Sequence, residues 1–222
     1  MRAAQGYAFE GSASTVLKKG GKFMLRALEK GVGRKRVKIN ESASVSTAPD
    51  PEKDEPELRS ITLEPTGDCP ISGTSFRNID ELSKILRLAP NSQNLDKSIL
   101  SRYKEPRTRN PGAADGLSVV HLPGAEKDQY QLILFQYTIS AKHGIPASAL
   151  NCVWDAYPGD LKKSCKTEVC SVCVISTDLG DEFSPQVVIA ATNENQQKDK
   201  YPNWQEVIKQ KVLKMTDLIL WG

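Results

Sequence analysis

An apolar run at residues 130–140, "YQLILFQYTIS", constrains the fold more than any other stretch of the sequence. It is too short to cross a membrane as a helix, which takes about 20 apolar residues. Its aromatic and β-branched residues are typical of a buried strand. A second apolar run, "GLSVVHL" at 116–122, precedes it across the polar turn "PGAEKDQ". The two runs therefore predict an antiparallel hairpin at the centre of a sheet.

The other segments predict helices and strands that alternate around this hairpin. Apolar residues at helical spacing predict helices at 7–19, 78–89 and 146–157, and a closing helix within 201–221. Apolar runs bounded by turn residues predict strands at 22–28, 58–65, 168–177 and 185–192. This order predicts an α/β (α+β) fold in which helices flank a central mixed sheet, as one domain over residues 1–222. Residues 40–57, rich in Ser, Pro, Asp and Glu, predict a flexible, disordered insert within that domain.

Charge is distributed unevenly along the chain. The net charge is only +3, but the first 40 residues hold ten Lys and Arg against two Glu. Such a segment favours nucleic acid as a partner, with a solvated basic surface as the alternative. The cluster "GRKRVK" at 33–38 fits either a nuclear-localisation signal or a phosphate-binding surface. The residues that we expect to contact nucleic acid are Lys18, Lys19, Lys22, Arg26, Arg34, Lys35, Arg36, Arg107 and Arg109.

The sequence favours a reducing compartment, with the nucleus as the expected location, either the cell's own or a host's after secretion. No apolar run reaches membrane-spanning length, and the first residues show no secretory signal. Five cysteines, an odd number at low density, argue against a disulfide scaffold. Cys170 and Cys173 would fall on opposite faces of one strand, which favours core positions over a zinc site completed by Cys165.

One face of the run at 130–140 turns from apolar to polar part-way along. Side chains alternate in a strand, so Gln136, Thr138 and Lys142 share a face with the apolar residues before them. Asp115 precedes the partner strand, and counting from the turn predicts that it approaches residues 138–140. A carboxylate beside such a polar row is an arrangement that can hold Mg²⁺. The alternative is a buried strand that simply leaves the core. His143, just after the row, is a further candidate base or phosphate contact.

Three motifs, in order, resemble the C-terminal domains of crinkler effectors and of trypanosomatid retrotransposon hot spot proteins. They are "FEGSASTVLKKGGKFMLRAL" (9–28), "RYKEPRTRNPGAADGL" (102–117) and "LFQYTISAKHGI" (134–145). Each motif is degenerate, and the ordered set covers residues 6 to about 150. The resemblance implies a divergent PD-(D/E)xK fold, the restriction-endonuclease-like architecture.

The resemblance also implies a site for metal-dependent phosphodiester cleavage. Glu10 and Asp115 stand at the family's acidic positions, and Gln136 and Thr138 replace its second strand acid and its lysine. Lys142 would assist. Glu10, Asp115 and Gln136 would hold Mg²⁺ or Mn²⁺ for a nuclease acting on nucleic acid, DNA first. A host protein or an upstream NTPase domain are further implied partners. Because Gln supplies no charge and Thr no cation, the alternative is a catalytically inactive effector or interaction domain that binds DNA or a host protein.

Overall fold

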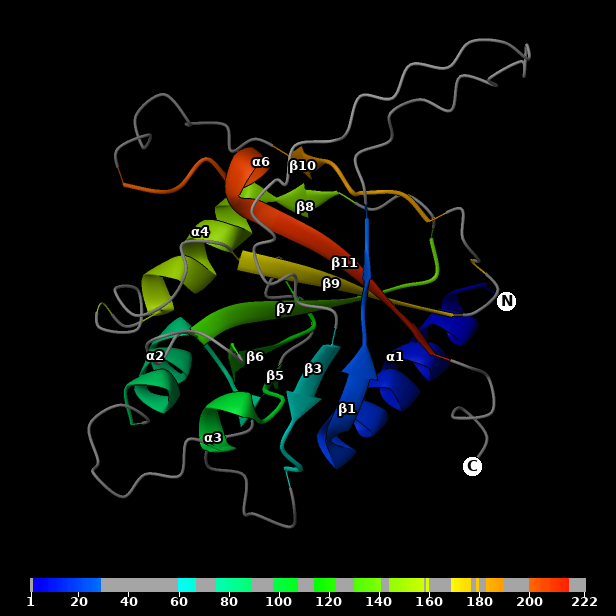
Figure 1. The fold of residues 1–222 in the computed structure, drawn as a ribbon, viewed down its shortest axis with the longest axis horizontal. Helices are drawn as coiled ribbons and strands as arrows, with labels where there is room; N and C mark the ends of the chain where they lie inside the picture. The colour runs from blue at the N-terminus through cyan, green and yellow to red at the C-terminus, as the bar shows by residue number, and fades with distance from the viewer. Residues whose placement is uncertain are drawn as a thin grey trace, which may run out of the picture.

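A five-stranded mixed sheet forms the centre of the computed structural model, and helices cover both of its faces (Figure 1). The described residues are 2–28, 60–66, 75–88, 98–107, 114–122, 130–140, 144–157, 159, 169–176, 179, 183–189 and 200–215. The strands of this sheet follow the order β2 (Arg26–Ala27), β11 (Ile208–Met215), β9 (Val169–Ser176), β7 (Tyr130–Thr138) and β6 (Gly116–His121). The predicted central mixed sheet flanked by helices is thereby confirmed.

The hairpin and a parallel crossover organise this sheet. β6 and β7 are antiparallel, with Gly116 opposite Phe135 and His121 opposite Tyr130. After β7 the chain passes through α4 (Ala147–Ala156) and returns as β9, which lies parallel to β7. Pro146 precedes α4, a position at which a missing N–H costs nothing. Every residue of β7 is buried, as its apolar composition requires of a central strand.

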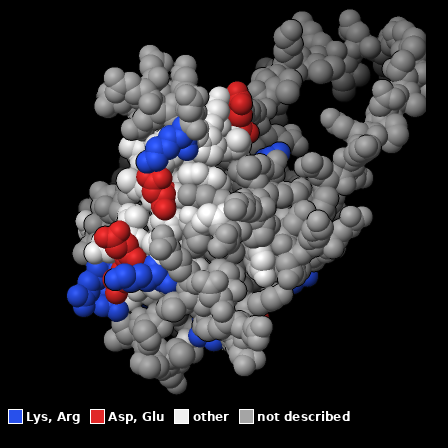
Figure 2. All heavy atoms as spheres, turned by 90° about the vertical axis from the view of Figure 1, so that its left-hand side faces the viewer, with Lys and Arg blue, Asp and Glu red and all other residues white. Residues whose placement is uncertain are grey.

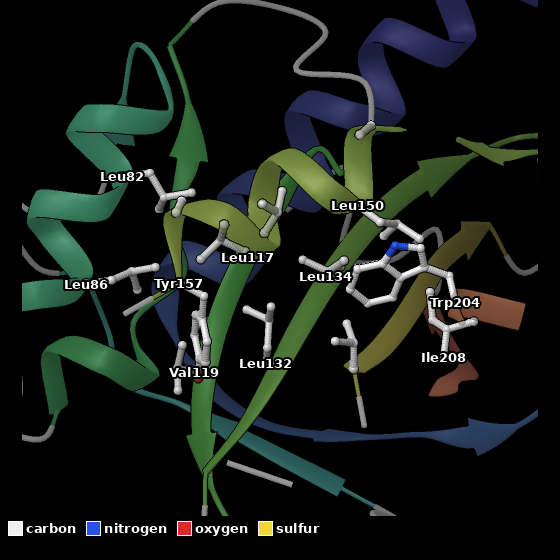
Figure 3. Packing of buried hydrophobic residues seen from close by; sticks show 14 of the residues in the cluster. Leu82, Leu86, Leu117, Val119, Leu132, Leu134, Leu150, Tyr157, Trp204 and Ile208 are labelled. Atoms are coloured by element: carbon white, nitrogen blue, oxygen red, sulfur yellow. The ribbon is translucent and has the colours of Figure 1, made fainter. Parts of the chain in front are cut away.

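Alternation along the strands divides the core into two layers. One face of the sheet packs against α2 (Ile79–Leu88), α4 and Trp204 of α6 (Trp204–Val207), and we call it the α4 face. Figure 3 shows Leu132 and Leu134 of β7 within this layer, together with Trp204. The other face packs against α1 (Arg2–Lys19) and β3 (Ser60–Leu63), and we call it the α1 face.

Three pairs of short strands in the described part of the chain lie outside the central sheet. β1 (Gly21–Met24) pairs with β3, β4 (Ser75–Phe76) with β5 (Glu105–Pro106), and β8 (Ile145–Pro146) with β10 (Val188–Ile189). α3 (Ser98–Ser101) lies before β5. Gly20 ends α1 with φ +73°, and a Cβ there would lie 2.6 Å from the Pro65 nitrogen. This turn therefore requires glycine.

Four predicted elements differ in the structure. Of the strand predicted at 185–192, residues 185–187 form no strand, and β10 (Val188–Ile189) pairs with β8. α1 begins at Arg2 rather than at residue 7. The single strand predicted at 22–28 is two strands, because the chain leaves the β3 ribbon at buried Leu25 and joins β11 as β2. The predicted closing helix is wrong: α6 makes one turn, and residues 208–215 then form β11, paired along its length with β9.

No helix in the described part of the chain is long and apolar enough to cross a membrane. The proposed insert at 40–57 and the basic cluster at 33–38 lie outside the described residues.

Candidate functional site

Two buried tyrosines join the hairpin to the segment before β5. The Tyr103 hydroxyl donates to the backbone oxygen of Asp115 at 3.0 Å and forms a hydrogen bond with the Tyr137 hydroxyl. The Tyr103 ring also meets the edge of the Phe135 ring, with centroids 5.6 Å apart. Burial raises the pKa of both phenols above their usual value. Both hydroxyls therefore stay protonated at neutral pH and act as hydrogen-bond donors.

α1 reaches this tyrosine pair through a polar side chain and an ion pair. Ser14 donates to Glu105 Oε2 at 2.7 Å, and Lys18 forms an ion pair with the other carboxylate oxygen of Glu105. A further side-chain hydrogen bond joins Ser14 to Tyr137. Glu10 lies one turn before Ser14 on the same side of the helix, since residues four apart share a helix face. Polar groups of α1, β5 and β7 thus meet at one end of the α1 face.

Asp115 forms hydrogen bonds to β7 next to the tyrosine pair. Its carboxylate Oδ2 accepts a hydrogen bond from the Tyr137 backbone N–H at 2.7 Å, and its own N–H donates to the Phe135 oxygen at 2.8 Å. Extending the hairpin register by one residue sets Asp115 opposite Gln136. The prediction that Asp115 approaches residues 138–140 was therefore wrong by two residues, because β6 ends at His121, three residues before the assumed start of the turn, whereas β7 begins at Tyr130, one residue after its assumed end.

Gln136 and Thr138 lie on the face of the sheet that α1 does not cover. They alternate with Phe135 and Tyr137, which pack against α1. Gln136 is 6% exposed, and its carbonyl Oε1 is buried without a hydrogen-bond partner. The Thr138 hydroxyl is used locally, because it accepts from Ser140 N–H and donates to Ser140 O, both at 3.0 Å.

This geometry suits a divalent metal poorly. Glu10 sits on a helix that packs on the α1 face, whereas Gln136 belongs to the α4 face. Asp115, opposite Gln136 in the extended register, already accepts a backbone hydrogen bond. In the described ranges, no three His, Cys, Asp or Glu side chains come together as a metal site. Lys142 and His143 lie outside those ranges, so their roles stay predictions.

Replacing Asp115 separates its structural role from a metal-binding role. Asp115→Asn keeps an oxygen that accepts the Tyr137 N–H, so we expect a free energy of unfolding close to that of the natural protein. Asp115→Ala leaves that N–H without its acceptor, and we expect a decrease of about 1–3 kcal/mol. Urea denaturation of both variants measures this. Equal decreases would show that the charge itself matters. A melting temperature raised by Mg²⁺ in the natural protein, but not in Asp115→Asn, would indicate a metal ligand.

A basic edge forms where the first and last strands of the sheet meet. β2 pairs antiparallel with β11, and Arg26 lies opposite Val212. Diagonal neighbours share a face across such a pair, which brings Arg26 beside Lys214. Both side chains are exposed, as are Lys19 and Lys22, and Lys209, which alternation places on the other face of β11. We call these five residues the basic edge.

The other predicted nucleic-acid contacts have different surroundings. Lys18 is engaged by Glu105, and exposed Arg107 donates to Ser75 Oγ at 2.9 Å. The remaining four, Arg34, Lys35, Arg36 and Arg109, lie outside the described residues. Sequence reasoning missed Lys209 and Lys214 because it assigned their segment to a helix. It missed Glu105 and the tyrosine pair because no local pattern marks residues joined across the fold, although Tyr103 and Pro106 do belong to a recognised motif.

Comparisons of the chain with protein-family models, with curated proteins and with solved structures gave no match.

Proposed function

We propose that this protein is a restriction-endonuclease-like domain of the crinkler and retrotransposon-hot-spot type that binds nucleic acid without cleaving it. The pairing of β2 with β11 carries the proposal, because it joins the basic N-terminal segment to the lysines of the last strand. Like charges on one face of paired strands destabilise the pair. A phosphate backbone relieves that repulsion when it binds there.

The surface around α2 and α4 supports this choice by contrast. Figure 2 shows basic and acidic side chains next to one another on the side of α2 and α4. Lys200 and Asp155 form an ion pair there at 3.3 Å, and α2 carries Asp80 and Glu81 as well as Lys84. Mixed charge of this kind attracts a polyanion little. The strand β11, by contrast, carries three lysines and no acid, and two of those lysines belong to the basic edge.

Metal-dependent cleavage is the second candidate, and one observation favours it. Asp115 stands at the start of β6, opposite Gln136 of the neighbouring strand, as the family pattern implies. Against it stand the hydrogen bond that occupies Asp115 and the division of Glu10 and Gln136 between two faces. Incubating plasmid and oligonucleotides with the protein and Mg²⁺ or Mn²⁺ decides between the two. Cutting that disappears in Asp115→Asn would replace our proposal with the nuclease.

Removing charge from the basic edge tests nucleic-acid binding directly. We expect Arg26→Ala/Lys214→Ala to weaken binding to a fluorescein-labelled DNA. The slope of log K against log salt should fall by about 0.9 for each phosphate that the variant no longer neutralises. Fluorescence anisotropy across a salt series measures both quantities. Lys84→Ala, an exposed lysine of α2, is the matched control. Equal affinity and slope in the double variant and the control would contradict the proposed surface.

A further inference from the structure

The outward side of α1 carries an exposed aromatic ring and leads toward the basic edge. Phe9, Ala13 and Leu17 point into the core, whereas Tyr7, Gly11, Thr15 and Lys19, spaced by four, are exposed and form the outward side. Tyr7 is 55% exposed, and among the described residues it is the one aromatic side chain that stands so open to solvent. A large ring exposed to this degree is a common feature of binding surfaces.

Small residues separate this ring from the lysines. Gly11 and Thr15 lie on the exposed strip between Tyr7 and Lys19. A Cβ added at Gly11 would meet nothing within 4 Å, so the strip is open at its middle. The rise of a helix, about 1.5 Å per residue, puts roughly 18 Å between the two ends. A strand of nucleotides can lie along such a strip and continue to Lys22.

Charge decides which class of molecule this strip suits. Residues 2–28 contain five basic side chains, Arg2, Lys18, Lys19, Lys22 and Arg26, and one acidic side chain, Glu10. A polyanion is therefore favoured, and an aromatic ring adds a surface on which a base can stack. The bases of a duplex stack on one another and are shielded, whereas those of a single strand present their faces.

We propose that the outward side of α1 binds single-stranded nucleic acid, with a base stacked on Tyr7 and phosphates of nucleotides farther along the strand at Lys19 and Lys22. This rests on the proposed function, since it names the form of nucleic acid that the basic edge receives. Tyr7 supplies stacking energy that is largely independent of base identity, so binding has little sequence preference. Arg26 and Lys214 then hold the phosphates farther along the strand.

The test compares one oligonucleotide sequence as a single strand and as a duplex. Anisotropy titrations use the natural protein, Tyr7→Ala and Tyr7→Phe, in which the ring remains. We expect tighter binding of the single strand, a roughly tenfold weaker affinity in Tyr7→Ala, and affinity within about twofold of the natural protein in Tyr7→Phe. Duplex affinity should change less than about twofold in either variant. Since Tyr7 is exposed, melting temperatures should be unchanged, which verifies that the variants fold.

Each other outcome overturns the inference in a recognisable way. If Tyr7→Ala binds the single strand as tightly as the natural protein does, no base stacks on this ring. If Tyr7→Ala weakens binding of the single strand and the duplex equally, the Tyr7 ring does not distinguish single-stranded from double-stranded nucleic acid. Its effect on binding would then come from the structure of α1. In both cases, weaker binding by Arg26→Ala/Lys214→Ala leaves the proposed function standing. Failure of the natural protein to bind either form overturns both.

Discussion

Gly116→Ala is expected to lower the free energy of unfolding by about 3 kcal/mol or more. A Cβ at this position would lie 2.2–2.3 Å from three atoms of the Tyr103 ring and hydroxyl. Tyr103 is fully buried and is held by hydrogen bonds to Asp115 and Tyr137. The ring therefore cannot yield without breaking those bonds, and overpacking adds to the cost of breaking them. Urea denaturation, with a check that the m-value is unchanged, measures the effect.

Gly11→Ala provides the matched control for this substitution. A Cβ at Gly11 meets no atom within 4 Å, and Gly11 lies inside α1. Alanine is the better helix former, so we expect a gain of up to about 1 kcal/mol. Placing Gly116→Ala in a Tyr103→Ala background should cost clearly less than in the natural protein, because the clash is gone. Additive effects in that cycle would mean that Tyr103 is not the obstacle.

Stability is expected to rise with pH between about 7 and 10 because of Lys104. This side chain is fully buried, and its ammonium donates to the Leu100 and Arg102 backbone oxygens at 2.8 and 2.9 Å. Burial, with a smaller contribution from the Arg102 charge, lowers the pKa of Lys104 from 10.5 to about 7. Above that pH the unfolded chain binds a proton that the folded one has released. The free energy of unfolding therefore increases by up to about 1.4 kcal/mol per pH unit, until the unfolded pKa is reached.

Urea denaturation of the natural protein, Lys104→Met and Lys84→Met over this pH range isolates the Lys104 effect. The natural protein and Lys84→Met should share the upward slope, since Lys84 is exposed on α2. Lys104→Met should lack the added slope, whatever its stability at neutral pH. The comparison uses slopes because methionine also removes two hydrogen bonds from the end of α3. Parallel curves for all three proteins would refute the lowered pKa.

The central hairpin, α2 and α4 could be predicted because each is specified by residues close in sequence. β11 could not be. Its buried apolar residues Val212, Leu213 and Met215 lie four, five and seven positions after buried Ile208, and these spacings fit one side of a helix as well as they fit a strand. Residues 208–215 form a strand because they pair with β9 and β2, two strands far away in the sequence. No local sequence pattern indicates such partners.

The candidate site was predictable in the same uneven way. Counting along the hairpin brought Asp115 within two residues of its true position, since only the length of the turn was uncertain. The bond between the Tyr103 and Tyr137 hydroxyls joins residues 34 apart, and the bond from Ser14 to Glu105 spans 91. Contacts between residues so far apart in the sequence do not affect the local spacing of apolar and polar residues. The roles of Glu105 and the tyrosines therefore emerged only from the fold.

The position of β11 between β2 and β9 has a consequence for how the protein is made. A ribosome synthesises Arg26 long before Lys214, yet among the described strands β2 pairs with β11 alone. β2 must therefore wait for its partner while nearly two hundred further residues are translated, although β1 can already pair with β3. Nascent chains halted before residue 208 should carry β6 and β7 but no assembled basic edge. The basic edge is thus assembled only after β11 has been synthesised.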